Sequence, residues 1–143
     1  MIDVDKDQIR EKLHCMRLNL KYLEDFKDIE PDVFASDPVK SAAAVRMLQV
    51  VMEAMLDICC HIIARNGWGM PTTYCEVVSI SESNGLIPSE LEGTYLKMAR
   101  FRNRIVHHYN DIDIIEVLDI IKERLEIFNP FISIITSRYF DSG

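Results

Sequence analysis

Residues 38–67 read PVKSAAAVRMLQVVMEAMLDICCHIIARNG, and this stretch decides the fold. It predicts one long helix, which Asp37 can cap with Pro38 in the first position and which runs to about Arg65, before Asn66-Gly67. One apolar stripe of this helix consists of Val45, Leu48, Met52, Met55, Cys59 and Ile62, and a neighbouring one of Met47, Val51, Ala54 and Ile58. A helix that is apolar on two faces lies at the centre of a fold or is buried partly by a second chain.

The remaining ridge of this helix is polar and consists of Arg46, Gln49, Glu53, Asp57, His61 and Arg65. We interpret this ridge as a solvated face, which is the usual arrangement opposite an apolar stripe. The alternative is that Glu53 or Asp57 orients an arginine of the basic segment that is described below.

The rest of the chain has the same helical periodicity, and no strand is predicted. Apolar residues at alternating steps of four and three predict a first helix over about residues 9–23. A short helix is predicted over about residues 74–82. The helix after it opens with the spacing of a capping box between Ser89 and Glu92, and it is expected to end at about Asn110.

A last helix can be capped by Asp111 or Asp113. Its apolar stripe consists of Ile114, Leu118, Ile121, Leu125, Phe128, Ile132 and Ile135. Pro130 lies inside this stripe, so we expect a kink near Phe128 or a break with Asn129 as a new cap. Together the elements predict an all-α fold in a single domain over residues 1–143, an antiparallel bundle of four long helices and a short one. The apolar surface exceeds what one bundle hides, so we also expect a homodimer.

The composition is that of a folded soluble protein, since 48% of the 143 residues are hydrophobic and 27% are charged. The most apolar stretch, residues 50–64, contains Glu53, Asp57 and His61, which argues against a membrane span. The charged start of the chain lacks the apolar core of a signal peptide. We therefore expect a cytoplasmic protein that does not associate with a membrane.

The chain contains no Cys-x-x-Cys pattern, which argues against a zinc site. Its four cysteines are Cys15, Cys59, Cys60 and Cys75. We interpret them as reduced, mostly buried thiols that behave as small apolar residues. No residue pattern predicts a bound metal or a cofactor.

Residues 102–109 read RNRIVHHY and concentrate two arginines, two histidines and a tyrosine. No acidic residue lies between Lys97 and Asn110, and the four cations there leave a formal charge of −11 on the rest of a chain that totals −7. Arginine is a permanent, forked binder of phosphate, and histidine exchanges a proton near neutral pH. An acidic body with one basic segment favours a focused phosphate site over a surface that coats nucleic acid.

Arg102 and His107 are five residues apart, which separates their side chains by about 140° on an uninterrupted helix. They can meet if the helix ends near His107, if the long Arg102 side chain wraps round, or if two chains place both copies of the segment in one cleft. Arg100, Arg104 and His107 or His108 share one face by steps of three and four. Arg104 is therefore a candidate phosphate contact as well.

The pattern Arg102-x-x-x-x-His107-x-Tyr109 after an apolar helix resembles the signature of HEPN domains, and more closely that of their HepT-like toxin branch. The similarity extends to residues 46–49, 61–63, 66–71, 85–88 and 98–103. The resemblance implies a helical bundle that dimerises with two motifs facing a shared cleft. It implies a metal-independent endoribonuclease, without a cofactor, that acts as the toxin of a toxin–antitoxin pair. A minimal nucleotidyltransferase antitoxin would be its partner and would transfer AMP to Tyr109.

The chemistry of these residues agrees with such roles. His107 would act as general base on a ribose 2′-OH or as general acid to the leaving 5′-oxygen. Arg102 would bind the scissile phosphate and stabilise the charge that develops in the transition state. Asn103 would donate to the phosphate or hold His107, or it would only cap the helix. Arg104 and His108 are further supporting candidates without an assigned role.

The predicted substrate is RNA because only RNA carries an internal 2′-OH nucleophile. An AMP group on Tyr109 would add a negative phosphodiester next to the basic segment and repel that substrate. Two other classes of function are open. One is a HEPN-type module that binds a nucleotide or a partner and cleaves nothing, which the acidic body favours. The other is a helical dimer whose basic segment docks an acidic partner.

Overall fold

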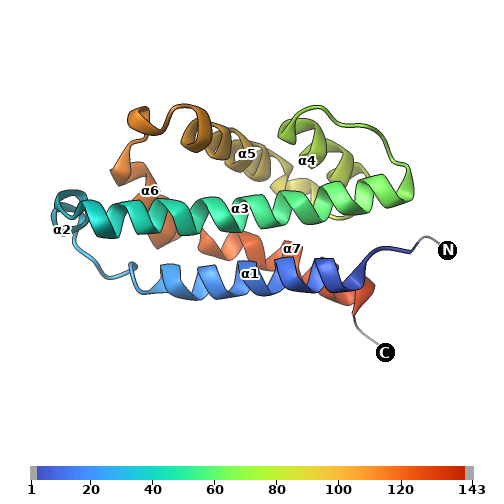
Figure 1. Cartoon of the computed structure of the whole chain (residues 1–143), viewed down its shortest axis with the longest axis horizontal. Coiled ribbons are helices and arrows are strands. Elements are labelled where there is room, and N and C mark those ends of the chain that lie inside the picture. Colours follow the sequence, from blue (N-terminus) through green and yellow to red (C-terminus); the bar gives the residue numbers. More distant parts are fainter. Residues whose placement is uncertain (1–2, 141–143) are drawn as a thin grey trace.

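The computed structural model describes residues 3–140, and within them the chain forms seven α-helices, three 3-10 helices and no strand (Figure 1). The α-helices are α1 (Lys6–Glu24), α2 (Pro31–Ser36), α3 (Pro38–Asn66), α4 (Tyr74–Ser83), α5 (Glu92–His107), α6 (Ile114–Glu123) and α7 (Phe128–Tyr139). The 3-10 helices are η1 (Ser89–Leu91), η2 (Tyr109–Asp111) and η3 (Leu125–Ile127). The predicted all-α class is confirmed, but the described residues contain more helices than the four long ones and one short one predicted. The two ends of the predicted domain, residues 1–2 and 141–143, lie outside the described residues.

Helix α3 lies at the centre of the fold. In Figure 1 it runs through the middle of the molecule, and it contacts α1, α2, α4, α5 and α6. Both predicted ends are confirmed: the Asp37 carboxylate accepts from the N–H groups of Val39 and Lys40 at 3.1 Å, and Gly67 closes the helix with φ of 66°. Both of its apolar stripes are covered inside one chain. Of the two explanations for a helix that is apolar on two faces, a central position in the fold is therefore the one that holds.

By length and composition alone, α3 also passes for a membrane-spanning helix. No other helix of the described residues is long and apolar enough to cross a membrane. In α3, 56% of the residues in the most apolar 18-residue window are buried inside the fold. Such burial is the behaviour of a core helix, and Glu53 and Asp57 lie within the same helix.

Helix α2 was not predicted. Six residues are too few to show a helical period. Pro31 occupies the first helical position, where its missing N–H costs nothing. The helix buries Phe34, whose ring meets that of Phe26 edge-on with 5.9 Å between the centroids. The connection between α1 and α3 is therefore part of the core and not a plain loop.

The predicted last helix is broken into α6 and α7, and the break lies earlier than expected. Helix α6 ends at Glu123, η3 follows, and α7 begins at Phe128 with Pro130 in its first turn. A proline cannot bond the carbonyl four residues earlier, and in a continuous helix its ring clashes with that carbonyl. The turn before Pro130 therefore leaves the α-helix, and Asn129 is not the cap. The predicted cap of the sixth helix is confirmed, since Asp113 accepts from the N–H of Ile115 at 2.9 Å.

The apolar stripe of α6 and α7 is covered within one chain. Its buried members are Leu118, Ile121, Leu125, Phe128, Ile132 and Ile135. The surplus of apolar surface from which we predicted a homodimer is thus absent along this stripe, and that reason for a dimer is wrong. Exposed apolar side chains are spread over the surface, at Leu18, Tyr22, Val33, Val39 and Met70. Three more lie within the basic segment or shortly after it in the chain, where Val106, Tyr109 and Ile115 are 42%, 49% and 40% exposed.

All four cysteines are free thiols, as predicted. Only Cys59 is buried, whereas Cys15, Cys60 and Cys75 are half-buried, so the prediction of burial holds for one of the four. Burial raises the pKa of the Cys59 thiol to about 12, which keeps it neutral in the core. Within residues 3–140, no three His, Cys, Asp or Glu side chains are grouped so as to hold a metal ion.

Candidate active site

Helix α5 carries the basic segment and is anchored through one buried face. Tyr95, Met98, Phe101 and Ile105 are buried on it, and the Tyr95 hydroxyl donates to the carbonyl of Ile127. The capping box predicted at the start of this helix does not form. The 3-10 helix η1 precedes α5, so the cap position falls on Leu91. The apolar side chain of Leu91 makes no capping hydrogen bond.

Helix α5 ends at His107, three residues before the predicted end at Asn110. The N–H of His108 still bonds the carbonyl of Arg104 at 2.8 Å, and His108 then leaves the helix with φ −138° and ψ 46°. His107 is therefore an exposed side chain on the last helical residue. The first of the three explanations for the five-residue spacing, a helix that ends near His107, is what the structure shows.

The Arg102 side chain points to α3, where Glu53 binds it. Nε and Nη2 of Arg102 both donate to Oε2 of Glu53, at 3.0 Å and 2.7 Å. The two side chains are only 16% and 25% exposed. Our interpretation of the polar ridge as a solvated face is wrong for Glu53, whose carboxylate pairs with an arginine of the basic segment, as the alternative required. Asp57 does not share this role because it pairs with Lys12 at 3.1 Å.

The ring of Tyr74 lies under the same guanidinium. The central carbon of the Arg102 guanidinium is 4.7 Å from the ring centroid, which is a cation–π contact. Tyr74 is the first residue of α4, directly after its cap Thr73. Burial raises the pKa of the Tyr74 phenol above its usual value, and the charge of Arg102 acts in the opposite direction. Arg102 is thus held from two sides, by a carboxylate and by an aromatic ring.

Asn103 and His107 face a cavity of about 400 Å³ between the end of α5 and the start of α4. The residues that line this cavity are Cys60, Pro71, Thr72, Thr73, Tyr74, Val77, Asn103 and His107. The Oδ1 atom of Asn103 also accepts from Nη1 of Arg102 at 3.3 Å, so its amide connects the arginine to the cavity wall. Arg102, Asn103 and His107 therefore gather around Tyr74, a residue that sequence reasoning missed. Its position at the start of a helix was the only sequence signal, and that signal indicates structure and not chemistry.

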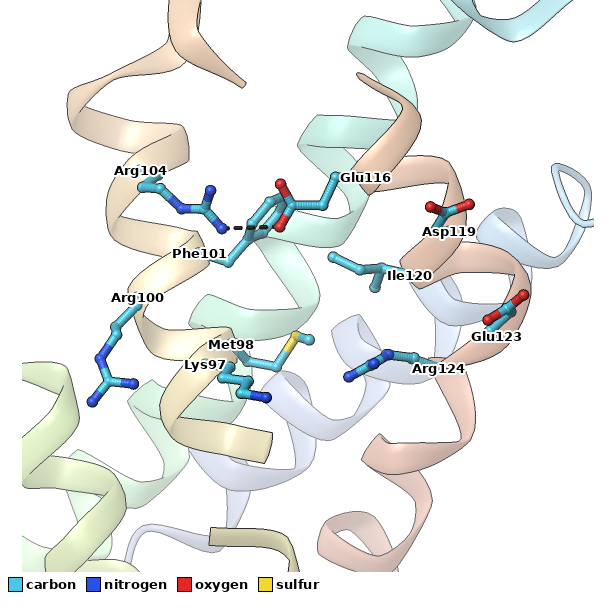
Figure 2. A pocket seen from close by; sticks show the side chains of 10 residues that line it. All are labelled: Lys97, Met98, Arg100, Phe101, Arg104, Glu116, Asp119, Ile120, Glu123 and Arg124. Carbon is cyan, nitrogen blue, oxygen red and sulfur yellow. Dashed lines mark hydrogen bonds and ion pairs between the residues drawn. The ribbon is translucent and has the colours of Figure 1, made fainter. Parts of the chain in front are cut away.

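Arg104 lies at a different cavity, of about 710 Å³, between α5 and α6 (Figure 2). Its Nη2 donates to Glu116 at 3.0 Å, and its guanidinium packs over Phe101 at 4.9 Å from the ring centroid. In Figure 2, Arg100 points away from α6. The face that we predicted to be shared by Arg104 and His107 is thus divided between two cavities.

The remaining predicted residues, His108 and Tyr109, lie beyond the end of α5. Both are exposed, and Tyr109 lies in η2 with 49% of its surface accessible. Tyr109 is therefore not a core residue. Its hydroxyl has no hydrogen-bond partner among the described residues that would hold it in place.

The comparisons with known proteins agree with this architecture. The family model described as "Ribonuclease HepT-like" matches residues 16–135. The mRNA nuclease HepT of Shewanella oneidensis is 27% identical over 135 residues, which cover 94% of this chain and 98% of that protein. The tRNA nuclease HepT of Aphanizomenon flos-aquae is 26% identical over 137 residues, which cover 96% of this chain and 93% of that protein.

Two solved structures have the same fold. The tri-AMPylated Shewanella oneidensis HEPN toxin in complex with MNT antitoxin superposes with a TM-score of 0.82 at 26% identity, over 92% of this chain and 98% of that one. The cytosolic protein YutE from Bacillus subtilis superposes with a TM-score of 0.83 over 96% of this chain and 92% of that one, at 20% identity, which shows the fold alone. Since the family model covers most of the chain, this protein belongs to the ribonuclease HepT-like family.

Proposed function

We propose that this protein is the toxin of a toxin–antitoxin pair, an endoribonuclease that cleaves RNA with Arg102 and His107. The observation that carries the proposal is the convergence of Arg102, Asn103 and His107 around Tyr74 in a protein of the HepT-like family. Its relatives in that family include proteins named as an mRNA nuclease and a tRNA nuclease. An exposed imidazole, and a guanidinium fixed over the tyrosine that lines the same cavity as that imidazole, are suited to a phosphodiester that enters from solvent.

The proposed reaction is an internal transfer at the phosphorus. The ribose 2′-oxygen attacks, the bond from phosphorus to the 5′-oxygen breaks, and the chain ends in a 2′,3′-cyclic phosphate and a 5′-hydroxyl. His107 takes the proton from the 2′-OH or gives one to the leaving 5′-oxygen, and such a group contributes about 10²–10⁴-fold. Arg102 binds the phosphate oxygens and stabilises the added charge. Neither role calls for a metal ion, so we propose a metal-independent reaction.

Cleavage of labelled RNA in EDTA tests this mechanism. The wild type is expected to cleave, whereas Arg102→Ala and His107→Ala lose activity by at least about 10²-fold. His14→Ala is the matched control because His14 is an exposed histidine on α1 and has no part in the proposed site. Restoration of activity only by an added divalent cation contradicts the metal-independent mechanism. No cleavage of varied RNAs by the unmodified wild type supports the second candidate function, a module that binds a nucleotide or a partner.

We further propose a minimal nucleotidyltransferase antitoxin as the partner, with Tyr109 as the residue it modifies. The related HEPN toxin of known structure is tri-AMPylated and bound to an MNT antitoxin. The Tyr109 hydroxyl is accessible to such an enzyme: its oxygen would attack the α-phosphorus of ATP, pyrophosphate would leave, and the phenolic proton would go to solvent. Mass spectrometry after co-expression with a cognate nucleotidyltransferase should find adenylate that Tyr109→Phe abolishes. Adenylate that persists on Tyr109→Phe at the same amount contradicts the assignment.

A homodimer in the cytoplasm completes the proposal. The exposed side chains of Val106 and Tyr109 in the basic segment, and of Ile115 shortly after it in the chain, support an interface there, with a second copy bringing its own His107 to the site. Sedimentation at micromolar concentration measures the mass directly. A mass of one chain, close to 16.6 kDa, contradicts the dimer.

A further inference from the structure

The guanidinium of Arg102 has most of its hydrogen-bonding capacity already in use. An arginine carries five N–H groups in a planar fork. Two of them, on Nε and Nη2, point to Oε2 of Glu53, and one on Nη1 points to Oδ1 of Asn103. One N–H on Nη1 and one on Nη2 remain. Glu53 occupies the Nε–Nη2 edge of the guanidinium, so the neighbouring Nη1–Nη2 edge is the one that no carboxylate occupies.

Two parallel N–H groups on one edge are the arrangement that binds two oxygens of a phosphate. The free edge of Arg102 is therefore the one that suits a scissile phosphate, and the occupied edge is the one that fixes its direction. We propose that Glu53 is the positioning residue of Arg102, which holds the guanidinium so that its Nη1–Nη2 edge faces the RNA phosphate. This inference rests on the proposed function, to which it adds a residue.

Glu53 is itself held in place, so it can serve as a fixed point. It projects from α3, the helix that the rest of the fold covers. Its second oxygen, Oε1, lies 4.0 Å from Nη1 of Arg46, and the amide of Gln49 lies 3.4 Å from each of its oxygens. A carboxylate with neighbours at both oxygens has little freedom to rotate. The orientation of Arg102 is thus fixed by a residue of the central helix α3.

The helix geometry shows why Arg102 needs such a partner. On α5, the directions of Arg102 and His107 differ by about 140°. The Arg102 side chain lies against α3 and over Tyr74, and His107 projects from the helix end into the cavity that Tyr74 also lines. A long arginine without a partner would extend into water and sample many rotamers. Loss of Glu53 would also leave a charge that is only 16% exposed without its counter-ion.

The competing explanation for the same contact is a lock, by which we mean that Glu53 inhibits cleavage by holding Arg102 away from the substrate. If Glu53 kept Arg102 away from the substrate, its removal would free the arginine and speed cleavage. If Glu53 positions Arg102, its removal slows the chemical step, since a displacement of about 1 Å in a catalytic group can cost about 10²-fold. The two explanations therefore differ in the sign of the effect.

The experiment compares Glu53→Ala and Glu53→Gln with the wild type and with Asp57→Asn. Asp57 lies one helical turn further along the same ridge and has its own partner, Lys12, so its variant makes the same change of charge outside the site. The first measurement is the Arg102 Nε–H resonance in NMR spectra of the full chain, assigned with Arg102→Lys. The second is kcat and KM for a labelled RNA in EDTA.

We expect a slowly exchanging Arg102 Nε–H in the wild type and in Asp57→Asn, and its loss in Glu53→Ala. We expect kcat to fall by about 10- to 100-fold in Glu53→Ala with KM changed by less than about threefold. Glu53→Gln keeps an acceptor oxygen without the charge and should lie between the two. Equal or faster cleavage by Glu53→Ala overturns the proposal, and faster cleavage identifies a lock.

The NMR measurement separates this proposal from the proposed function. A wild type that cleaves no RNA contradicts the ribonuclease, and the exchange of the Arg102 Nε–H then decides alone whether Glu53 orients the arginine. An Arg102 Nε–H that exchanges equally fast in the wild type and in Glu53→Ala overturns the positioning role, whatever the activity.

Discussion

The guanidinium of Arg102 lies 4.7 Å above the centre of the Tyr74 ring, although the two residues belong to different helices and are separated by 28 positions. Tyr74 also lines the cavity that His107 faces. This one ring therefore connects the proposed phosphate-binding group to the proposed proton-transfer group, and it defines the side of α5 on which the chemistry would occur.

Replacement of the Tyr74 ring is expected to weaken RNA cleavage. Tyr74→Leu removes a cation–π contact worth about 0.5–1 kcal/mol, so kcat/KM should fall by about two- to fivefold. Tyr74→Phe keeps the ring face and should retain activity close to the wild type. Cleavage rates of both variants, at equal folded fractions measured by circular dichroism, check this. A larger loss in Tyr74→Phe than in Tyr74→Leu would show that the hydroxyl, and not the ring, is what matters.

The proposed nucleophile predicts a sharp dependence on one ribose. An RNA with a single 2′-deoxy nucleotide on the 5′ side of the cleaved bond should not be cut there, because the attacking oxygen is missing. Mass spectrometry of the products from the unmodified RNA should find a 2′,3′-cyclic phosphate and a 5′-hydroxyl. The same deoxy nucleotide placed one position further along is the control and should leave cleavage intact. Cleavage at the deoxy position would mean that water, and not the 2′-oxygen, attacks.

Tyr95 is expected to stabilise the fold through its hydroxyl. The side chain is fully buried, and its hydroxyl donates to the carbonyl of Ile127 in η3, which ties α5 to the break between α6 and α7. Tyr95→Phe would remove this part-buried hydrogen bond and lower the free energy of unfolding by about 1 kcal/mol. Urea unfolding measures this. Tyr22→Phe, at a ring 44% exposed, is the control and should change stability little.

The buried thiol of Cys59 predicts a loss of stability at alkaline pH. Burial raises its pKa from 9.0 to about 12 in the folded state, whereas in the unfolded chain the thiol has its ordinary pKa. The raised pKa therefore adds stability that is fully present below about pH 9 and is lost as the pH rises towards 12, with a slope of about 1.4 kcal/mol per pH unit. Urea unfolding across this range should give a shallower decline for Cys59→Ala. Parallel declines for the two proteins would show that the thiol is not the cause.

Most of the helices could be predicted from the sequence because their signals are local. Asp37 with Pro38 starts α3, Gly67 ends it, and Asp113 caps α6, each through bonds to residues within a few positions. The all-α class follows from the apolar period alone. Local signals also have a limited range. The six residues of α2 are too short for a period, and the effect of Pro130 on a turn four residues earlier displaced the predicted break.

The sequence by itself determined which residues are candidates for the chemistry: Arg102, Asn103, His107 and Tyr109 stand together in an acidic chain, and their types and spacing indicate a phosphodiester site. The tertiary structure alone decided which partners hold them. Glu53 is 49 positions from Arg102 and is one of several polar residues on its helix, so no spacing rule selects it over Asp57. Only the packing of α5 and α4 against α3 brings the carboxylate to the guanidinium and the Tyr74 ring beneath it. Pairing over such a separation depends on the whole core, which is why periodicity predicts the helices and not the contact between them.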